Sequence, residues 1–541
     1  LIIRVHSSWS LLSRDDSWEL LAPKLLAQHL DAFEIIATEV LSDDDPRYDL
    51  PADERWCAAV HDKSPKYSGR LRKSISETLA LLGAIGARIP TTPIPSAFRA
   101  ERVIRSLLAG ASWKRWASLK LPLLAEASPE AFLEAIEKDL ESQDPQLPRL
   151  FIEQGESIMS SCTHADLLWA LETLAWSPVY LSPAILALAR LTQLDPPGGK
   201  WANRPKNTLR EIFLPWLPQT AATAEQRMEV LEKLLAEIPQ IGSALLLDLL
   251  PSSHSSSSYT HRPAWRGWAL GVSSKVTNRE YWKQAEWCAE RLVQNLDMDN
   301  TLWEKLIDKI DHLPKKAFDL LIQKLQNVEL SKLPDNVKQE IFDALREKIN
   351  RHRGFADADW AMPNDILNIL EAAMERFQPT DLIQKNKWLF VNWPELPEER
   401  NNFEKRTDII FERRLQVLKE ILDKEGLERV LELAQCVEAS YAIGIVLGKS
   451  SLLASDDLLV PRFLASKKRE LANLSAGYVV GRFVDGGDKW VTGLKLDKWQ
   501  PEETGNLLLV LPFERKTWDL VEARGEKVLE YYWSSQTHDF Y

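Results

Sequence analysis

Residues 201–268 read WANRPKNTLREIFLPWLPQTAATAEQRMEVLEKLLAEIPQIGSALLLDLLPSSHSSSSYTHRPAWRGW, and this stretch decides the fold. Within it, the segment 224–238 places apolar residues on one side of a helix, and 241–250 predicts a second, more apolar helix. A loop rich in serine and proline follows over 251–263. Helices separated by proline and polar breaks are the pattern that the rest of the chain repeats.

Helical periodicity is clearest in the second half of the chain. Apolar residues recur at helical spacing over 303–310, 318–325, 341–349 and 415–422, with a loop predicted over 351–363. Because almost no alternating strand pattern occurs, the sequence predicts an all-α fold. A helical-repeat solenoid of the tetratricopeptide or HEAT type, with degenerate repeats, is the economical arrangement of such helices. No strict repeat consensus is present, so the type and number of repeats stay open.

Breaks in the helical pattern suggest three segments. We expect N-terminal helical repeats over 1–195, a central helical segment rich in Trp and Pro with the serine-rich loop over 196–300, and C-terminal helical repeats over 301–541. The chain starts at Leu1 without a methionine and lacks the regions of a signal peptide. We therefore expect it to be a fragment of a larger protein.

Composition narrows the classes of partner. The 541 residues include 21 tryptophans, and because tryptophan is large we expect most of them to pack between helices. The formal net charge of −12 argues against nucleic acid as a partner. No apolar run reaches the roughly 18 residues that span a bilayer. The four cysteines lie far apart, which is typical of free thiols in a reducing compartment, so we expect a cytoplasmic protein without a membrane partner.

Several patterns could indicate chemistry, but each has a simpler structural interpretation. The Asp triplet 43–45 lacks the spacing of a cation-binding loop and is expected to form a solvated turn. Cys57 and His61 are spaced to share one face of a helix, yet no second pair completes a zinc site. The segment 444–450 resembles a Walker A loop with one residue too few between its glycines, so we expect a helix end there.

Three further segments were weighed in the same way. The serines 255–258, flanked by His254 and His261, lack the glycine-flanked turn of a hydrolase nucleophile. Cations and aromatics alternate over 112–116, which would suit stacking on bases, although a helix with inward tryptophans explains them better. The glycines of 477–490 predict a close helix crossing followed by a turn. We expect no catalytic residue, no metal ligand and no cofactor in this chain, which would then not be an enzyme.

A resemblance to a known family rests on packing and turn motifs spread over most of the chain. They are LPADERW at 50–56, WANRP at 201–205, FLPWLPQT at 213–220, THRPAWR at 260–266 and LPFERKTWD at 511–519. With these motifs the chain resembles the long C-terminal helical region of large bacterial STAND-type NTPases, including antiviral (Avs-like) defence proteins. No catalytic residue can be carried over, because no position matches the family's ATPase or effector motifs.

The resemblance implies a sensor role. In such proteins a helical-repeat region recognises an invader's protein, for example a phage protein, and thereby releases oligomerisation. The effector and nucleotide-binding domains would belong to the same longer chain. Two alternatives stay open: a helical scaffold or oligomerisation arm without an invader ligand, and an enzyme whose site the sequence does not reveal.

Two predicted loops combine charge and aromatics, as protein interfaces do. We predict partner contacts in the first at His261, Arg262, Trp265 and Arg266. In the second we predict them at Arg351, His352, Arg353 and Trp360. For both loops, an ordinary surface loop with packed tryptophans is an equally good interpretation of the sequence.

Overall fold

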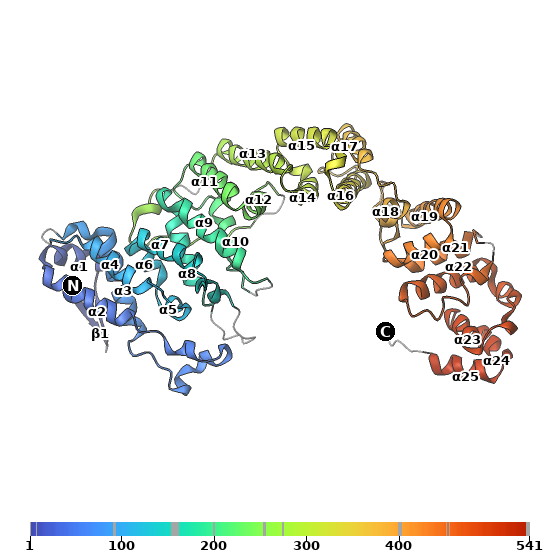
Figure 1. Cartoon of the computed structure of the whole chain (residues 1–541), viewed down its shortest axis with the longest axis horizontal. Coiled ribbons are helices and arrows are strands. Elements are labelled where there is room, and N and C mark those ends of the chain that lie inside the picture. The colour runs from blue at the N-terminus through green and yellow to red at the C-terminus, as the bar shows by residue number, and fades with distance from the viewer. Residues whose placement is uncertain are drawn as a thin grey trace. The chain divides into compact units, whose positions relative to one another are not determined.

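A computed structural model describes most of the chain: residues 2–6, 8–89, 93–152, 162–197, 201–252, 256–272, 275–398, 403–450, 452–453 and 455–536. These residues are mostly helical, which confirms the all-α prediction (Figure 1). One antiparallel hairpin precedes the helices and was not predicted. It consists of β1 (Ile2–Val5) and β2 (Ser8–Leu11), with Ile2 opposite Leu11. Each of its strands has only four residues, too few for a clear alternating pattern.

The helices form two compact units. Unit 1 comprises Leu1–Asn295 and His312–Phe318, and unit 2 comprises Leu296–Asp311 and Asp319–Tyr541. The segment predicted over 1–195 and nearly all of the segment predicted over 196–300 belong to unit 1. The segment predicted over 301–541 belongs to unit 2 apart from His312–Phe318.

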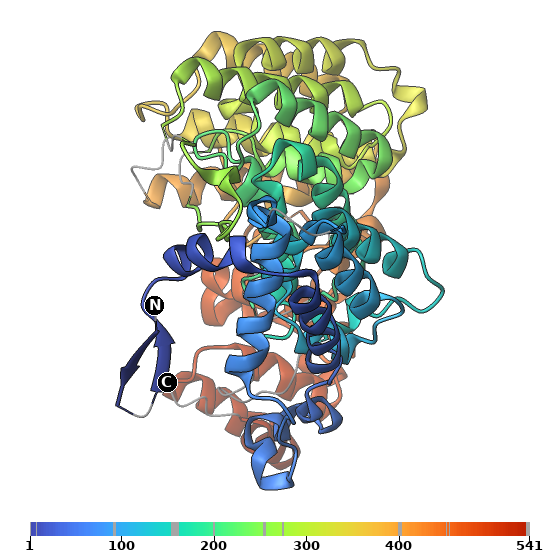
Figure 2. The same ribbon diagram turned by 90° about the vertical axis from the view of Figure 1, so that its left-hand side faces the viewer.

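In unit 1, helices close in sequence pack against one another (Figure 2). Contacts run from α3 to α6, from α6 to α8, from α8 to α9 and from α9 to α10 and α11. Their inner faces supply a core of fully buried leucine, isoleucine and phenylalanine side chains. The helices are α1 (Arg14–Leu21), α2 (Ala27–Leu41), α3 (Gly69–Ile85), α4 (Ser96–Leu108), α5 (Trp113–Ser118), α6 (Leu121–Ala127), α7 (Pro129–Leu140), α8 (Ala165–Ala175), α9 (Pro178–Leu194), α10 (Pro205–Phe213), α11 (Ala224–Glu237), α12 (Pro239–Asp248) and α13 (Asn278–Asn295).

Prolines that the sequence marks as breaks begin helices in unit 1. Pro129, Pro178, Pro205 and Pro239 are the first residues of α7, α9, α10 and α12. The first turn of a helix tolerates proline because its N–H groups have no partner inside the helix. Thr223 begins α11 through a capping box with Gln226.

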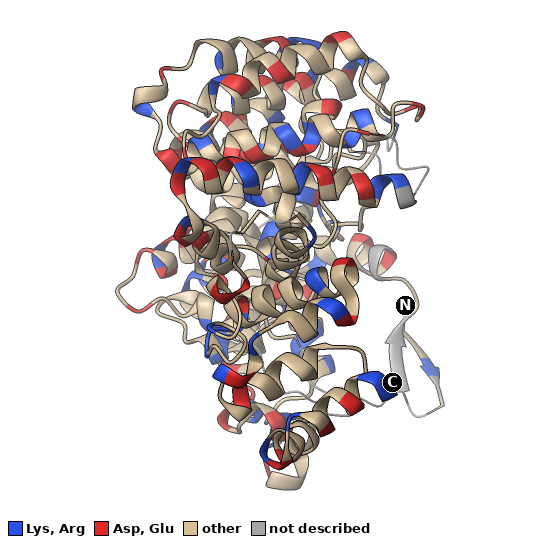
Figure 3. Cartoon of the chain, turned by 90° about the vertical axis from the view of Figure 1, so that its right-hand side faces the viewer, with Lys and Arg blue, Asp and Glu red and all other residues tan. Residues whose placement is uncertain are grey.

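Unit 2 contains α14, most of α15 and the helices that follow α15. Basic and acidic residues are interspersed along these helices (Figure 3). Its helices are α14 (Leu302–Asp308), α15 (Lys315–Asn327), α16 (Asp335–Gly354), α17 (Asn364–Arg376), α18 (Leu382–Asn386), α19 (Phe403–Glu425), α20 (Leu427–Cys436), α21 (Ser440–Ser450), α22 (Arg469–Gly493), α23 (Pro501–Val510), α24 (Arg515–Ala523) and α25 (Glu526–Ser535).

The loop predicted over 351–363 starts later than expected. Arg351, His352 and Arg353 form the last turn of α16, and the loop comprises 355–363. Basic side chains stabilise the carboxyl end of a helix through its dipole, so three consecutive cationic or titratable residues extend α16 rather than interrupt it.

The predicted close helix crossing is confirmed between α21 and α22. A Cβ atom on Gly444 or Gly477 would overlap the backbone of the opposite helix, and the same holds for Gly448 and Gly481. After the crossing, Gly487 takes a left-handed φ of 56° and bends the chain within α22. The glycines of the Walker-like segment thus permit backbone contact, and Lys449 lies in the last turn of α21 as expected.

Candidate functional site

The segment 256–268 of unit 1, called the strap below, is extended or bent rather than helical until Gly267. Its backbone donates hydrogen bonds to side chains that reach it from separate helices. The Ser258 N–H donates to Glu211 Oε2 of α10 at 2.9 Å, and the His261 N–H donates to Glu172 Oε2 of α8 at 2.7 Å. These bonds pair the backbone of the strap where no helix or sheet does so.

Gln219 binds the strap through both ends of its amide. Its Oε1 accepts from the Thr260 N–H at 2.7 Å, and its Nε2 donates to the Ser258 carbonyl at 2.8 Å. The Gln219 side chain is buried, so both of its hydrogen-bonding groups are satisfied by the strap and by the Glu211 carbonyl.

Glu126 of α6 holds the other end of the strap. Its Oε1 accepts from the Ala264 N–H at 2.9 Å, and its Oε2 accepts from the N–H groups of Trp265 at 2.6 Å and Arg266 at 2.9 Å. Glu126 is only 1% exposed. A buried carboxylate is costly unless it accepts several hydrogen bonds, and the strap supplies three.

Burial changes the titration of the groups beneath the strap. It raises the pKa of Glu172 above its ordinary value, while hydrogen bonds from the His261 N–H and the Thr208 hydroxyl act in the opposite direction. Burial likewise raises the pKa of Glu211. Burial also lowers the pKa of the His261 imidazole, which belongs to the strap itself.

The His261 side chain faces inward. Its ring stacks on Trp169 of α8 with centroids 5.9 Å apart, and its Nδ1 lies 3.0 Å from the Thr173 hydroxyl. Its carbonyl accepts from the indole Nε1 of Trp176 at 3.0 Å. His261 is therefore anchored to unit 1 through its ring, its N–H and its carbonyl.

Arg262 faces solvent. Its guanidinium carbon lies 4.8 Å from the ring centroid of Trp176, over the indole face, and the side chain is exposed. No carboxylate among the described residues lies within ion-pairing distance of it. The Arg262 guanidinium thus rests on Trp176 and forms no ion pair within the described residues.

Arg266 ties the strap to two helices. Its Nε donates to the Glu126 carbonyl at 2.9 Å, and its second nitrogen donates to the Gly83 carbonyl of α3 at 3.0 Å. Its guanidinium also lies 5.4 Å from the ring centroid of Trp268. Trp265, its neighbour, is half-buried. The strap therefore brings together all four predicted contact residues, but only Arg262 among them is exposed.

The second predicted group forms a corner at the end of α16 in unit 2. His352 is buried, and its Nδ1 accepts from the Met362 N–H at 3.0 Å. Its Nε2 lies 3.5 Å from Asp311 Oδ2, and the Lys348 ammonium lies 3.2 Å from the other oxygen of Asp311. This arrangement makes His352 a structural residue of the corner rather than an exposed contact.

Trp360 covers the corner from the loop that follows α16. Its ring meets His352 edge-on at 5.3 Å and is 49% exposed. Arg351 places its guanidinium 5.6 Å from the centroid of Trp360. Arg353 is committed to Glu371, with nitrogen–oxygen distances of 3.0 and 2.6 Å. Arg351 and Trp360 are therefore the accessible members of this group.

Glu126, Glu172 and Gln219 were not among the site residues predicted from the sequence. Each is a polar residue in or beside an otherwise apolar segment, such as LPLLAEA at 121–127 and ADLLWALETLA at 165–175. Glutamate is almost never buried without a partner. An isolated glutamate in an apolar helix was the available signal, but it does not say which segment supplies the partner.

The patterns weighed for metal or nucleotide chemistry have structural roles. The cations of 112–116 pair with acidic residues: Lys114 lies 2.6 Å from Asp49, and Arg115 pairs with Asp44 of the Asp triplet. Trp116 is buried, which confirms the packing interpretation of that helix. Within the described residues, no group of three or more His, Cys, Asp or Glu side chains could hold a metal ion.

The Cys57 and His61 pair lies in a 3₁₀ segment (Ala52–His61) that is kinked at Cys57, where the backbone angles are not helical. In a 3₁₀ helix, residues four apart do not share a face, so the geometry of a zinc-binding pair is absent. Of the residues weighed for hydrolase chemistry, His254 and Ser255 lie outside the described residues.

Cys162 and His164 form a thiol and imidazole pair that the sequence analysis did not weigh. The Cys162 sulfur lies 3.2 Å from His164 Nε2, but the same nitrogen lies 2.7 Å from the Asn203 carbonyl. A carbonyl only accepts, so His164 Nε2 carries the hydrogen and donates it there. It therefore cannot act as the base for the thiol.

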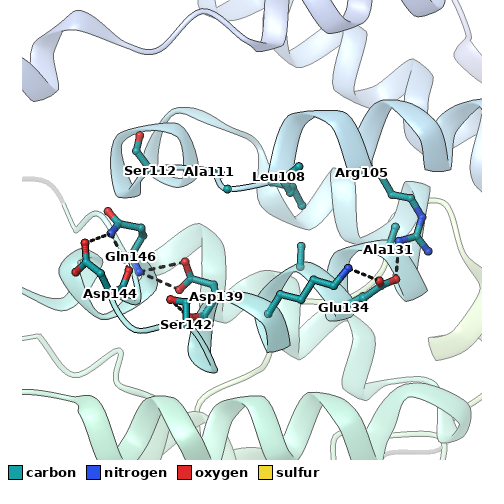
Figure 4. A pocket seen from close by; sticks show the side chains of 14 residues that line it. Arg105, Leu108, Ala111, Ser112, Ala131, Glu134, Asp139, Ser142, Asp144 and Gln146 are labelled. Carbon is teal, nitrogen blue, oxygen red and sulfur yellow. Dashed lines mark hydrogen bonds and ion pairs between the residues drawn. The ribbon is translucent and has the colours of Figure 1, made fainter.

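A cavity of about 670 Å³ is lined by α4, by residues 109–112 that follow it, by α7 and by the segment 142–146 (Figure 4). Its charged lining is already paired: Glu134 binds both Arg105 and Lys138, the latter at 2.7 Å. Asp139 accepts from the Gln146 N–H at 3.1 Å. The dashed lines in Figure 4 mark these bonds, which leave little free hydrogen-bonding capacity for a charged ligand.

Comparison with known proteins gives no relative for this chain. No family model matches it, and neither the curated proteins nor the solved structures contain a significant match. In the described part of the chain, no helix combines the length and apolarity needed to cross a bilayer.

Proposed function

We propose that this chain is a non-enzymatic protein-recognition module, the sensor of a bacterial antiviral STAND NTPase. In this proposal an invader protein binds to it and triggers activation of the longer, cytoplasmic protein. Its helices would form a degenerate helical-repeat solenoid, whose extended faces suit protein ligands. The effector and nucleotide-binding domains would lie elsewhere in the same protein.

The observation that carries the proposal is the exposed Arg262 stacked on a buried tryptophan. Arginine and tryptophan are enriched where interfaces gain most of their binding energy. Arg262 rests on the Trp176 face at 4.8 Å, and the segment that bears it is fixed by buried acceptors on both sides. A contact residue that is ordered before binding loses less conformational entropy on association.

The corner of unit 2 supports the same function. Arg351 and Trp360 repeat the combination of an exposed arginine and a tryptophan ring, here at 5.6 Å. The Trp360 side chain is half-exposed, although exposing a tryptophan to water is costly. It packs on the His352 ring, and the ion pair between Asp311 and Lys348 lies beside that ring. A contact surface explains this exposure better than a packing role does.

Affinity capture tests the proposal. The purified chain would be immobilised and exposed to extracts of virus-infected and uninfected bacteria, with mass spectrometry of the retained proteins. We expect one viral protein to be retained at stoichiometric amount by the wild-type chain. The purified viral protein should then bind the wild-type chain and bind less tightly to the Arg262→Leu variant.

A matched variant and a second method separate this proposal from a scaffold. Arg279→Leu removes another exposed arginine of unit 1 that makes no ion pair among the described residues, and it should leave binding unchanged. If the folded wild-type chain retains no viral protein but self-associates in sedimentation velocity, it acts as an oligomerisation arm and the sensor proposal fails.

A further inference from the structure

We infer that the ligand of the strap presents an acidic side chain, which the guanidinium of Arg262 binds. This inference rests on the proposed function and specifies the chemistry of the partner. It is argued from the free edge of the guanidinium, from the rigidity of the segment that bears it, and from the groups around it.

The stacking of Arg262 leaves its hydrogen-bonding edge free. A guanidinium carries its five N–H donors in its plane, so the tryptophan face occupies only the flat side. The guanidinium carbon lies 4.8 Å from the Trp176 centroid, and no hydrogen bond occupies the Arg262 donors within the described part of the chain. Two parallel N–H groups match the two oxygens of one carboxylate.

The carboxylates beneath the strap do not compete for Arg262. Glu172 accepts from the His261 N–H at 2.7 Å, and Glu126 accepts three N–H groups from residues 264–266. Both are therefore occupied by the backbone of the strap itself. Neither lies within ion-pairing distance of Arg262, so the charge of its side chain is available to a partner.

The backbone on each side of Arg262 is fixed. The preceding residue, His261, is held at its N–H by Glu172 and at its carbonyl by Trp176, at 2.7 and 3.0 Å. Two residues later, Ala264 is held by Glu126 at 2.9 Å. Trp176 therefore restrains Arg262 in two ways. Its indole N–H binds the carbonyl of the preceding residue, His261, and its ring lies under the Arg262 guanidinium.

Exposed aromatic side chains belong to the strap or contact it. Tyr259 on the strap is 83% exposed, and Trp169, which stacks on His261, is 40% exposed. Aromatic side chains are enriched among the residues that anchor protein interfaces. The partner that fits the strap is thus a peptide segment with an aspartate or glutamate beside apolar residues.

Selection from a random peptide library tests the inference directly. Short random peptides displayed on phage would be selected on the immobilised full chain, and the enriched sequences would be read. We expect aspartate and glutamate to be enriched together with apolar residues. The affinity of a selected synthetic peptide, measured by fluorescence anisotropy, should fall about tenfold in the Arg262→Leu variant.

Two further variants define the chemistry. Arg262→Lys keeps the charge but loses the planar fork, so it should recover only part of the affinity. Arg279→Leu should bind the peptide as the wild type does. Circular dichroism of the Arg262→Leu variant should match that of the wild type, since Arg262 is exposed.

Three results would overturn the inference: enriched peptides without acidic residues, an affinity unaffected by Arg262→Leu, or no enriched peptide at all. The proposed function fails separately. If a viral protein is captured independently of Arg262, only the acidic contact is wrong. If acidic peptides bind through Arg262 but no viral protein is captured, the site exists and the sensor role is wrong.

Discussion

The strap of unit 1 and the α21–α22 crossing of unit 2 are held together in different ways. In unit 1 a non-helical segment runs across α6, α8 and α10, and buried or partly buried acidic side chains of these helices hold its backbone. In unit 2 the helices α21 and α22 approach until their backbones touch, because glycines remove the side chains between them. The first arrangement depends on hydrogen bonds to buried carboxylates, and the second depends on close packing.

This difference determines where each unit tolerates change. Added volume destabilises a closely packed helix crossing, whereas loss of an acceptor destabilises a segment that is held by hydrogen bonds to buried carboxylates. The acceptors in unit 1 bind only the backbone of the strap, so the Arg262 side chain can face solvent without any change in the core. The following predictions begin with the largest expected effect.

Adding one methyl group to the helix crossing should destabilise unit 2. The Cβ of a Gly477→Ala variant would overlap the Tyr441 carbonyl, so the helices would have to separate. We expect a loss of about 3 kcal/mol in the free energy of unfolding, the upper end for overpacking. Urea unfolding would measure it, and hydrogen exchange would assign the loss to α21 and α22.

Gly493→Ala is the matched control for the crossing. It lies in the same helix, and a Cβ atom there has no neighbour within 4 Å. Its stability should match or slightly exceed that of the wild type. Equal losses in both variants would contradict the role of the backbone contact, because helix propensity alone favours alanine over glycine at both positions.

Removing one carboxylate should release half of the strap in unit 1. Glu126→Ala leaves the N–H groups of Ala264, Trp265 and Arg266 without their acceptor. We expect a destabilisation of about 2 kcal/mol in urea unfolding, because unsatisfied buried donors are costly unless water reaches them. Glu137→Ala, at an exposed position of α7, should change the stability by less than about 0.5 kcal/mol.

Glu172 should make the stability of unit 1 depend on pH. Burial raises its pKa in the folded chain, whereas in the unfolded chain it titrates near 4.5. The protonated form is therefore favoured by folding, so this contribution is complete below pH 4.5 and is lost as the pH rises through the folded pKa. Compared with the Glu172→Gln variant, the wild type should lose thermal stability over that range. A constant difference between their melting temperatures would contradict the assignment.

The smallest expected loss of stability is that of Arg262→Leu, and Arg266→Leu is its comparison on the inward side of the strap. Arg262→Leu removes only an exposed stacking contact and should cost less than about 1 kcal/mol. Arg266→Leu removes donors to two buried carbonyls and should cost about 2 kcal/mol. Thermal denaturation of both variants would test this order. A larger loss for Arg262→Leu would mean that its side chain is part of the core.

Features encoded by neighbouring residues could be predicted from the sequence. Apolar spacing predicted helices in both units, and the glycines of 477–490 predicted the crossing that the structure contains. The error at Arg351–Arg353 is also local, because capping by basic residues outweighed the loop signal. These cases share short sequence separations, which a single sequence records directly.

The strap could be predicted only in part. The Trp, Arg and His content of 261–266 marked the segment as unusual, and the structure brings its four residues together. Its acceptors, however, are distant in sequence: Glu126 binds Arg266 across 140 positions. Nothing local links such residues, so the inward role of Arg266 and the outward role of Arg262 require the fold.

Hydrogen exchange on the wild-type chain tests the central claim most directly, namely that buried acceptors fix the strap and so preorganise Arg262. The amides of Thr260, His261, Ala264, Trp265 and Arg266 should be protected although no helix or sheet contains them. In the Glu126→Ala variant, protection should be lost from Ala264 to Arg266 and kept at Thr260 and His261. Fast exchange at all five amides in the wild type would contradict the account.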